Sequence, residues 1–324
     1  MTIKDLGTVF VGQQAKGTRV HAVIAFWAVV GLSAGCAPAP SNRPPGPDAG
    51  DGTMPEGNDA GGSPPVKKYV AMGSSYAAGP KIPDAVPDQA CGRSTGNYPH
   101  LVAAALGLDL TEVSCIGATI DNITTTAQTM NPIQLDAVTS DTDVITLTIG
   151  GNDVTYSSSL TTCGLDGMNG RSCLEPAAGA GAPDVDSSAV EELLNQEEGR
   201  LVAMLKKVRQ AAPVARIYLV GYPMVLPDPA VACPPDVPMQ AADATFLGMV
   251  GARLQMAFAS AAATAGVTFV DWYGASRGHD ACSPASVRWV EGQADAAVAV
   301  YHPNPSGMRA AADLIIAQIQ NDAR

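Results

Sequence analysis

From residue 67 onward, short apolar segments alternate with longer segments that have helical periodicity. The segment 144–149 (VITLTI) is rich in β-branched residues and predicts a buried strand. The other predicted strands are 67–72, 109–113, 216–220 and 267–270, and the predicted helices are 97–106, 190–211, 243–265 and 306–321. Strands that alternate with helices predict βαβ units, and therefore an α/β fold with a parallel sheet between helices. Sites in such sheets form at the carboxyl ends of the strands.

One segment, 155–188, interrupts this alternation. It lacks a strong period and contains Cys163 and Cys173. We expect a long loop there that is fixed by a disulfide bond and lies near the site. No internal repeat is present, and residues 67–324 are expected to form one folded domain.

The first 36 residues have the pattern of an export signal. Basic residues precede an apolar run at 22–32, which is too short to span a membrane but suits the core of a signal peptide. The run leads into LSAGC at 32–36, which resembles a bacterial lipobox, although Ser33 stands where an aliphatic residue is usual. We therefore expect a signal peptide over 1–36 and a lipid on Cys36.

Residues 37–66 are dominated by Pro, Gly, Asp and Ala and contain almost nothing that fills a core. This composition predicts a linker of roughly 30 Å if it is a flexible coil. Such a spacer suits a folded domain tethered to a membrane. The alternative is a plain signal peptide that is cut near Ala37 or Ala39 and leaves the protein free.

The net charge of -12 argues against nucleic-acid binding, which usually requires a basic surface. It favours a neutral or lipidic substrate over a polyanion. Membrane contact is expected through the lipid anchor alone, and the protein is expected to be a monomer.

Seven cysteines are present, and six remain when Cys36 is set aside. An even number fits an oxidising compartment and three disulfide bonds, whereas six buried free thiols would suit a cytosolic protein. No CxxC motif or Cys/His cluster has the spacing of a zinc site, so no metal is expected.

Four segments contain residues that acyl-transfer chemistry uses. Ser75 stands in a tight turn (GSSY) after the first predicted strand, and Gly117 follows the second. Asn152 follows the most apolar strand in GGND, and His302 precedes the last helix in HPNP. Each segment alone is ordinary, because Gly, Ser and Asn are common in turns and a lone His before a helix is more often a cap. Together they supply a nucleophile, oxyanion donors and a base.

In combination, these segments resemble the sequence blocks of the SGNH (GDSL) hydrolases. GSSY is similar to the GDS(L/Y) block, Gly117 to the glycine of the second block, GGND to the GxND block and His302-Pro303 to the terminal histidine block. The resemblance covers 67–324. The segments CGRS at 91–94 and GYP at 221–223 are similar to the secreted bacterial branch that has three disulfides.

This resemblance implies a three-layer, flavodoxin-like α/β/α sandwich of about five parallel strands. It implies Ser75 as nucleophile and His302 as base. The oxyanion hole would consist of the backbone N–H groups of Ser75 and Gly117 and the side chain of Asn152. The implied disulfides are Cys91–Cys115, Cys163–Cys173 and Cys233–Cys282.

Two positions depart from the family pattern. Ser74 replaces the usual Asp before the nucleophile, and Ala299 replaces the Asp that many members have three residues before the histidine. We therefore expect a Ser–His dyad in which a backbone carbonyl within 295–300 accepts from the imidazole. Asp280 and Asp295 are the acids nearest in sequence that would make a triad instead.

The function that follows is ester hydrolysis by a secreted serine esterase or lipase, with no metal or organic cofactor. An alternative within the same fold is a carbohydrate O-acetylesterase. An alternative from another class is a lipoprotein binding module that has lost catalysis, which the joint presence of Ser75, Asn152 and His302 disfavours.

Overall fold

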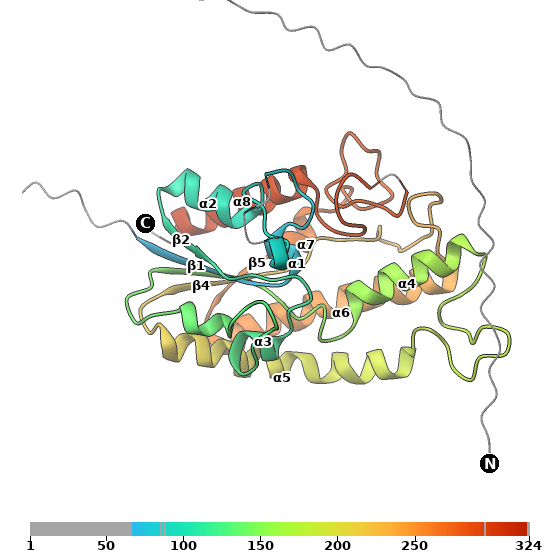
Figure 1. The fold of residues 1–324 in the computed structure, drawn as a ribbon, viewed down its shortest axis with the longest axis horizontal. Helices are drawn as coiled ribbons and strands as arrows, with labels where there is room; N and C mark the ends of the chain where they lie inside the picture. The colour runs from blue at the N-terminus through green and yellow to red at the C-terminus, as the bar shows by residue number, and fades with distance from the viewer. Residues whose placement is uncertain (1–66, 85, 87–88, 295, 323–324) are drawn as a thin grey trace, which may run out of the picture. The chain divides into compact units, whose positions relative to one another are not determined.

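Five parallel strands form the centre of the fold (Figure 1). The computed structural model describes residues 67–322 except 85, 87–88 and 295, so the predicted signal peptide, Cys36 and the whole predicted linker lie outside the described residues. The strands are β1 (Lys68–Gly73), β2 (Asp109–Glu112), β3 (Val144–Thr148), β4 (Arg216–Val220) and β5 (Thr268–Val270), in the order β2-β1-β3-β4-β5. The predicted α/β fold with a five-stranded parallel sheet is confirmed.

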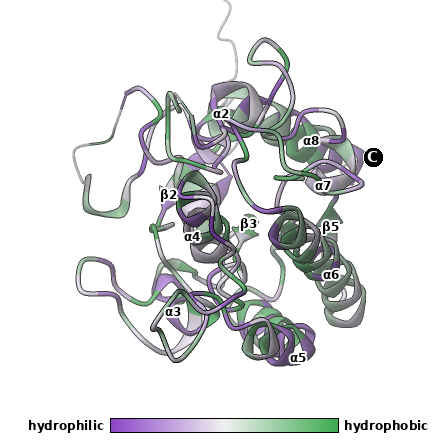
Figure 2. Cartoon of the chain, turned by 90° about the vertical axis from the view of Figure 1, so that its right-hand side faces the viewer, coloured by the Kyte–Doolittle hydropathy of each residue, from purple (hydrophilic) through white to green (hydrophobic). Residues whose placement is uncertain are grey.

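Helices cover both faces of this sheet and make three layers (Figures 1 and 2). One face carries α2 (Tyr98–Leu106) and α8 (Pro305–Asn321), which contact each other. The other carries α3 (Ile120–Thr124), α5 (Ser187–Ala211) and α6 (Ala241–Ala265). Short helices α1 (Ser75–Ala78) and α7 (Trp272–Ala275) follow β1 and β5, and 3-10 turns occupy Gln89–Cys91 and Gln134–Ala137. Each predicted strand and helix forms, with ends that differ by three residues or fewer.

Two hydrophobic cores lie on opposite faces of the sheet. Successive residues of a strand point to opposite faces, so β1 contributes Val70 and Met72 to the core under α5 and α6. The same strand contributes Tyr69 and Ala71 to the core under α2 and α8. Burial on both faces explains why β1 is apolar from Tyr69 to Met72 and does not alternate with polar residues.

The expectation of a loop over 155–188 is wrong in its first part. Residues Tyr156–Met168 form α4, and residues 169–186 contain no helix or strand. The helix is rich in Ser, Thr and Gly, which are weak helix formers, so its sequence lacks the expected signal. Its stability comes from packing against α6, where Leu160 and Cys163 are fully buried.

Among the described residues, α6 is the one helix that is long and apolar enough to cross a membrane. It packs on the sheet, and its Leu247, Leu254 and Phe258 are at most 1% exposed. The helix is therefore a core element of the domain.

The strand order creates a switch point between β1 and β3. The chain leaves β1 toward β2 on one side, whereas β3, β4 and β5 continue on the other side. Ligands of open α/β sheets bind at such points, outside the carboxyl ends of the strands. Ser75 follows β1, Gly117 follows β2 and Asn152 follows β3, so three of the predicted site residues stand at this edge.

Candidate active site

Ser75 and His302 are brought into hydrogen-bond contact at the carboxyl edge of the sheet. The Oγ atom of Ser75 lies 2.8 Å from Nε2 of His302, although 227 positions separate them in the sequence. Ser75 is the first residue of α1, directly after β1, and His302 lies in the loop before α8. A hydroxyl within hydrogen-bond reach of an imidazole is the arrangement of an activated nucleophile and its base.

The turn that carries Ser75 is fixed through Gly73. This glycine has a φ of +141°, and a Cβ there would lie 2.5 Å from the carbonyl oxygen of Thr148, so no other residue fits. The side chain of Gln134 holds both backbone groups of Gly73. Its Oε1 accepts from the Gly73 N–H at 2.7 Å, and its Nε2 donates to the Gly73 carbonyl at 3.0 Å. Gln134 was not identified from the sequence, because nothing in the sequence shows a contact to a backbone 61 positions away.

The imidazole of His302 is oriented by a backbone carbonyl. Its Nδ1 lies 2.7 Å from the carbonyl oxygen of Val300, within the range 295–300 where the sequence predicted such an acceptor. A carbonyl only accepts, so Nδ1 carries the proton and Nε2 is free to take one from Ser75. Burial lowers the pKa of His302 below its ordinary value, and the Val300 carbonyl opposes part of that effect.

The two acids that the sequence offered for a triad do not supply an orienting carboxylate in the described residues. Asp280 is 4% exposed, and its Oδ1 accepts from the N–H of Cys282 at 2.9 Å, which is a turn contact. Asp295 lies outside the described residues. The contacts of His302 are therefore those of a dyad.

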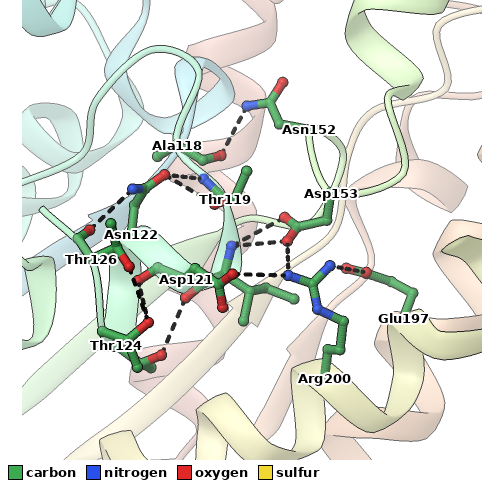
Figure 3. A network of polar contacts seen from close by, with 12 residues as sticks. Ala118, Thr119, Asp121, Asn122, Thr124, Thr126, Asn152, Asp153, Glu197 and Arg200 are labelled. Atoms are coloured by element: carbon green, nitrogen blue, oxygen red, sulfur yellow. Dashed lines mark hydrogen bonds and ion pairs between the residues drawn. The ribbon is translucent and has the colours of Figure 1, made fainter. Parts of the chain in front are cut away.

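The side chain of Asn152 is hydrogen-bonded to Ala118, the residue after Gly117. The Nδ2 of Asn152 donates to the carbonyl oxygen of Ala118 at 2.9 Å, as Figure 3 shows. A carboxamide has two N–H bonds, so this contact orients the side chain and leaves one donor for an oxyanion. Gly117 has a φ of +72°, and no atom lies within 4 Å of a Cβ built there. The backbone is thus open to a ligand at Gly117.

A groove of about 470 Å³ begins at Gly117. Its apolar lining includes Ile116 and Met130, which are 41% and 60% exposed although they are large hydrophobic residues. The other lining residues are Ala90, Cys115, Asn122, Ala127, Gln128 and Thr129. The groove offers an apolar ligand a surface beside the candidate oxyanion donors.

A buried ionic network supports the loop that carries Asn152 (Figure 3). Both oxygens of Asp153 accept from the N–H of Ile120 at 3.1 Å, and one lies 2.7 Å from Nη2 of Arg200. Asp153 therefore ties the loop after β3 to the first residue of α3. Burial raises the pKa of Asp153 to about 6, although the Arg200 guanidinium favours the carboxylate.

Glu197 lies behind the same loop, and its side chain is fully buried. One of its carboxylate oxygens lies 2.5 Å from where a Cβ on Gly150 would be, which explains the glycine at that position. Neither oxygen has a hydrogen-bond partner among the described residues, and the guanidinium of Arg200 is 3.9 Å away. Burial, followed by the nearby charge of Asp153, raises the pKa of Glu197 to about 8.

Tyr222 contacts Ser74, the residue that stands in place of the family's usual Asp. Its hydroxyl lies 3.1 Å from Oγ of Ser74 and also accepts from the Gly151 N–H at 3.1 Å. One hydroxyl thus joins the nucleophile turn to the loop of Asn152. The sequence showed Tyr222 only as part of a family segment, with no role attached.

The three disulfides are Cys91–Cys115, Cys163–Cys173 and Cys233–Cys282, which are the pairs that the resemblance implies. The first lies beside the groove, because Cys115 is part of its lining. Among the described residues, one group of three metal-type ligands lies together, namely Cys163, Cys173 and Asp243. Its two sulfurs are joined to each other and offer no thiolate, so the residues do not suit a metal ion.

Known proteins resemble this chain in sequence. The family described as "GDSL-like Lipase/Acylhydrolase family" matches residues 71–310. "Lipase 2" of Streptomyces coelicolor is 37% identical over 258 residues, which are 77% of this chain and 84% of that protein. A Streptomyces rimosus lipase is 28% identical over 241 residues, with 74% of this chain and 81% of that protein covered.

Solved structures have the same fold. The extracellular lipase of Streptomyces rimosus matches with a TM-score of 0.63 at 25% identity, over 78% of this chain and 99% of that one. Phospholipase A1 of Streptomyces albidoflavus NA297 matches with a TM-score of 0.62 at 23% identity and the same coverage. Because the matched region contains the Ser75 turn, the loop of Asn152 and the loop of His302, this chain belongs to the GDSL-like lipase/acylhydrolase family.

Proposed function

We propose that this protein hydrolyses carboxylic esters through an acyl-enzyme on Ser75, with His302 as the general base. The observation that carries the proposal is the 2.8 Å contact between Ser75 Oγ and His302 Nε2, with the far side of the ring bonded to Val300. The curated relatives are named lipases and an esterase, which supports the same reaction.

In the first step, Nε2 of His302 takes the proton of Ser75, and Oγ attacks the ester carbonyl carbon. The negative charge that develops on the carbonyl oxygen is stabilised by the free N–H of Asn152 and the backbone N–H groups of Gly117 and Ser75. The C–O bond to the alcohol then breaks, and the alcohol oxygen receives the proton from Nε2. The acyl group remains on Ser75.

In the second step, water gives its proton to His302 and attacks the acyl carbon. The same donors stabilise the second oxyanion, and the proton returns to Oγ as the acid leaves. The Val300 carbonyl keeps the ring in one tautomer during both steps. It stabilises the imidazolium less than a carboxylate would, because it carries only a partial charge.

The substrate we favour is an ester with an apolar acyl chain. The oxygen of the leaving alcohol must face Nε2 of His302, and no lining residue of the groove beside Gly117 comes from the His302 loop. The groove is therefore better placed for the acyl part, and exposed Ile116 and Met130 suit an apolar chain. A carbohydrate O-acetylesterase is the second candidate, because an acetyl group needs little of this groove.

The test is a hydrolysis series with p-nitrophenyl esters from acetyl to palmitoyl, with Ser75→Ala as the blank. The proposal expects kcat/KM to rise as the acyl chain lengthens beyond acetyl. A maximum at acetyl, together with release of acetate from an acetylated polysaccharide, would favour the second candidate. No hydrolysis of any ester above the Ser75→Ala blank would favour a binding module.

We also propose that the protein is exported, acts as a monomer and is held at the cell envelope by a lipid on Cys36. The three disulfides support an oxidising compartment. The lipobox-like sequence at 32–36 motivates the anchor. The Cys36→Ser variant should move the protein from the membrane fraction to a soluble or unprocessed form. Mature wild-type protein that is soluble and begins after Cys36 would contradict the anchor, and sedimentation of the domain tests the monomer.

A further inference from the structure

The residue before His302 has an unusual backbone. Tyr301 has a φ of +55°, a left-handed conformation that is unfavourable for any residue with a Cβ. The carbonyl of Val300 and the N–H of Tyr301 belong to one planar peptide. Rotation about the N–Cα bond of Tyr301 therefore swings the Val300 carbonyl relative to the His302 ring. The 2.7 Å contact from Nδ1 to this carbonyl depends on the left-handed conformation.

Backbone contacts hold part of this loop. The Tyr301 N–H donates to the carbonyl of Glu291 at 3.1 Å, and the Glu291 N–H donates to the carbonyl of His302 at 3.0 Å. These two bonds pair the loop with a neighbouring segment, and the His302 N–H donates to the carbonyl of Ala299 at 3.2 Å across the turn that contains Tyr301. They leave the carbonyl of Tyr301 for another partner.

That partner is Tyr76, which lies 225 positions earlier in the sequence. Its hydroxyl donates to the carbonyl oxygen of Tyr301 at 2.5 Å, and its side chain is completely buried. Its ring also packs against the imidazole of His302, with centroids 4.7 Å apart and planes tilted by 31°. Burial raises the pKa of Tyr76 well above its ordinary value, so the hydroxyl keeps the proton that it donates.

We infer that Tyr76 is a positioning residue for the base: it holds Tyr301 left-handed, so that the Val300 carbonyl orients His302. The residue directly after the nucleophile thereby controls the geometry of the base that activates it. This role explains how a dyad without an acid keeps one ring orientation. The inference rests on the proposed role of His302.

The first test is Tyr76→Phe, which removes the hydroxyl and keeps the ring. The expected result is a loss in kcat of about tenfold or more, in the range typical when a group that orients a reactive side chain is removed. KM should change less than about twofold, because Tyr76 is not expected to touch the substrate. The matched control is Tyr69→Phe on β1. It removes a buried hydroxyl that is hydrogen-bonded to Thr146 at 2.8 Å. It should leave kcat unchanged.

The pH profile separates positioning from a general loss of structure. The Val300 carbonyl raises the pKa of His302, whereas burial and the charge of Lys81 lower it. Loss of the carbonyl contact should therefore move the acid limb of kcat/KM to lower pH in Tyr76→Phe. A variant that is only partly folded would keep the wild-type inflection at reduced amplitude.

A second pair of variants tests the backbone itself. Tyr301→Gly and Tyr301→Ala both remove the ring, but only glycine adopts a φ of +55° without strain. Tyr301→Gly should retain a kcat about threefold or more above that of Tyr301→Ala, because a left-handed backbone is costly for alanine.

The inference is overturned if Tyr76→Phe has the kcat and the pH profile of the wild type, or if the two Tyr301 variants have equal kcat. These outcomes are distinct from failure of the proposed function. That function fails if the wild type hydrolyses no ester above the Ser75→Ala blank, or if His302→Ala keeps wild-type activity, whatever Tyr76→Phe does.

Discussion

His302 Nδ1 lies 2.7 Å from the carbonyl oxygen of Val300, two residues earlier in the same loop. The imidazole that we propose as the base is thus oriented by the backbone of its own loop. In the usual triad, a carboxylate from elsewhere fixes the ring and stabilises its positive charge. Here the Val300 carbonyl fixes the ring as a carboxylate would, but it stabilises the positive charge of the imidazolium only in part.

The dyad predicts that the nearby acids have no catalytic role. Asp280→Asn and Asp295→Asn, assayed singly, should each keep kcat within about tenfold of the wild type. Asp280 only accepts a turn hydrogen bond from the Cys282 N–H, which Asn also accepts. A loss of roughly 10³–10⁴-fold in kcat for either variant, the scale for a neutralised triad acid, would show a hidden triad.

The burial of His302 predicts the pH profile. Only the neutral imidazole takes a proton from Ser75, so activity appears as pH rises through the pKa of His302. Burial lowers this pKa below the ordinary value of 6.5. We therefore expect kcat/KM to rise to a plateau with an inflection below pH 6.5 and to stay on the plateau at neutral pH. An inflection above 6.5 would mean that a carboxylate stabilises the imidazolium.

The oxyanion role predicts the effect of Asn152→Ala. Loss of one oxyanion donor should lower kcat by roughly 10²–10³-fold, with a smaller change in KM, because the contact strengthens as charge develops. The control is Asn169→Ala, which also removes an amide-to-carbonyl bond, to Leu165 at 2.9 Å, at the end of α4. Equal kcat in Asn152→Ala and Asn169→Ala would mean that Asn152 is only a turn residue.

The sequence predicted most of the fold because its signals are local. The segment 144–149 is rich in β-branched residues and contains no charged residue, and long amphipathic helices such as α5 carry their own period. The helix α4 was missed because its Ser, Thr and Gly residues give no such period, and its helical form depends on packing against α6.

The residues of the candidate site could be predicted from the sequence, but the contacts between them could be predicted only in part. Ser75 and His302 follow from their segments, and their contact follows from the fold. The contacts of Gln134 and Tyr222 with backbone groups did not follow, because any residue type presents the same backbone N–H and carbonyl. The left-handed conformation of Tyr301 has no sequence signal either, since glycine or asparagine is usual there.

The buried Glu197 predicts a specific dependence of stability on pH. Its pKa is raised to about 8 in the folded protein, against 4.5 ordinarily. Between these values the folded state keeps a proton that the unfolded state has lost, so this contribution to stability falls as pH rises from about 4.5 to 8. Glu197→Gln removes the titration and keeps the shape. It should raise the free energy of unfolding at pH 8 by on the order of 1–3 kcal/mol, and by less at pH 5.

Denaturant unfolding of wild type and Glu197→Gln at pH 5 and pH 8 measures this difference. The exposed Glu191 on the same helix provides the control substitution, Glu191→Gln, which should show no such change with pH. If wild type and Glu197→Gln differ in free energy of unfolding by the same amount at pH 5 and pH 8, then Glu197 is ionised at both pH values and the Arg200 guanidinium compensates its charge.

The central claim is that Ser75 is a nucleophile activated by His302, and covalent labelling tests it most directly. The folded protein should react with a fluorophosphonate, and peptide mapping by mass spectrometry should find one modification, on Ser75. His302→Ala should label slower by a factor of about 10³ or more, because no base takes the proton of Oγ. No labelling of the wild type, labelling at another residue, or an equal rate in His302→Ala would contradict the account.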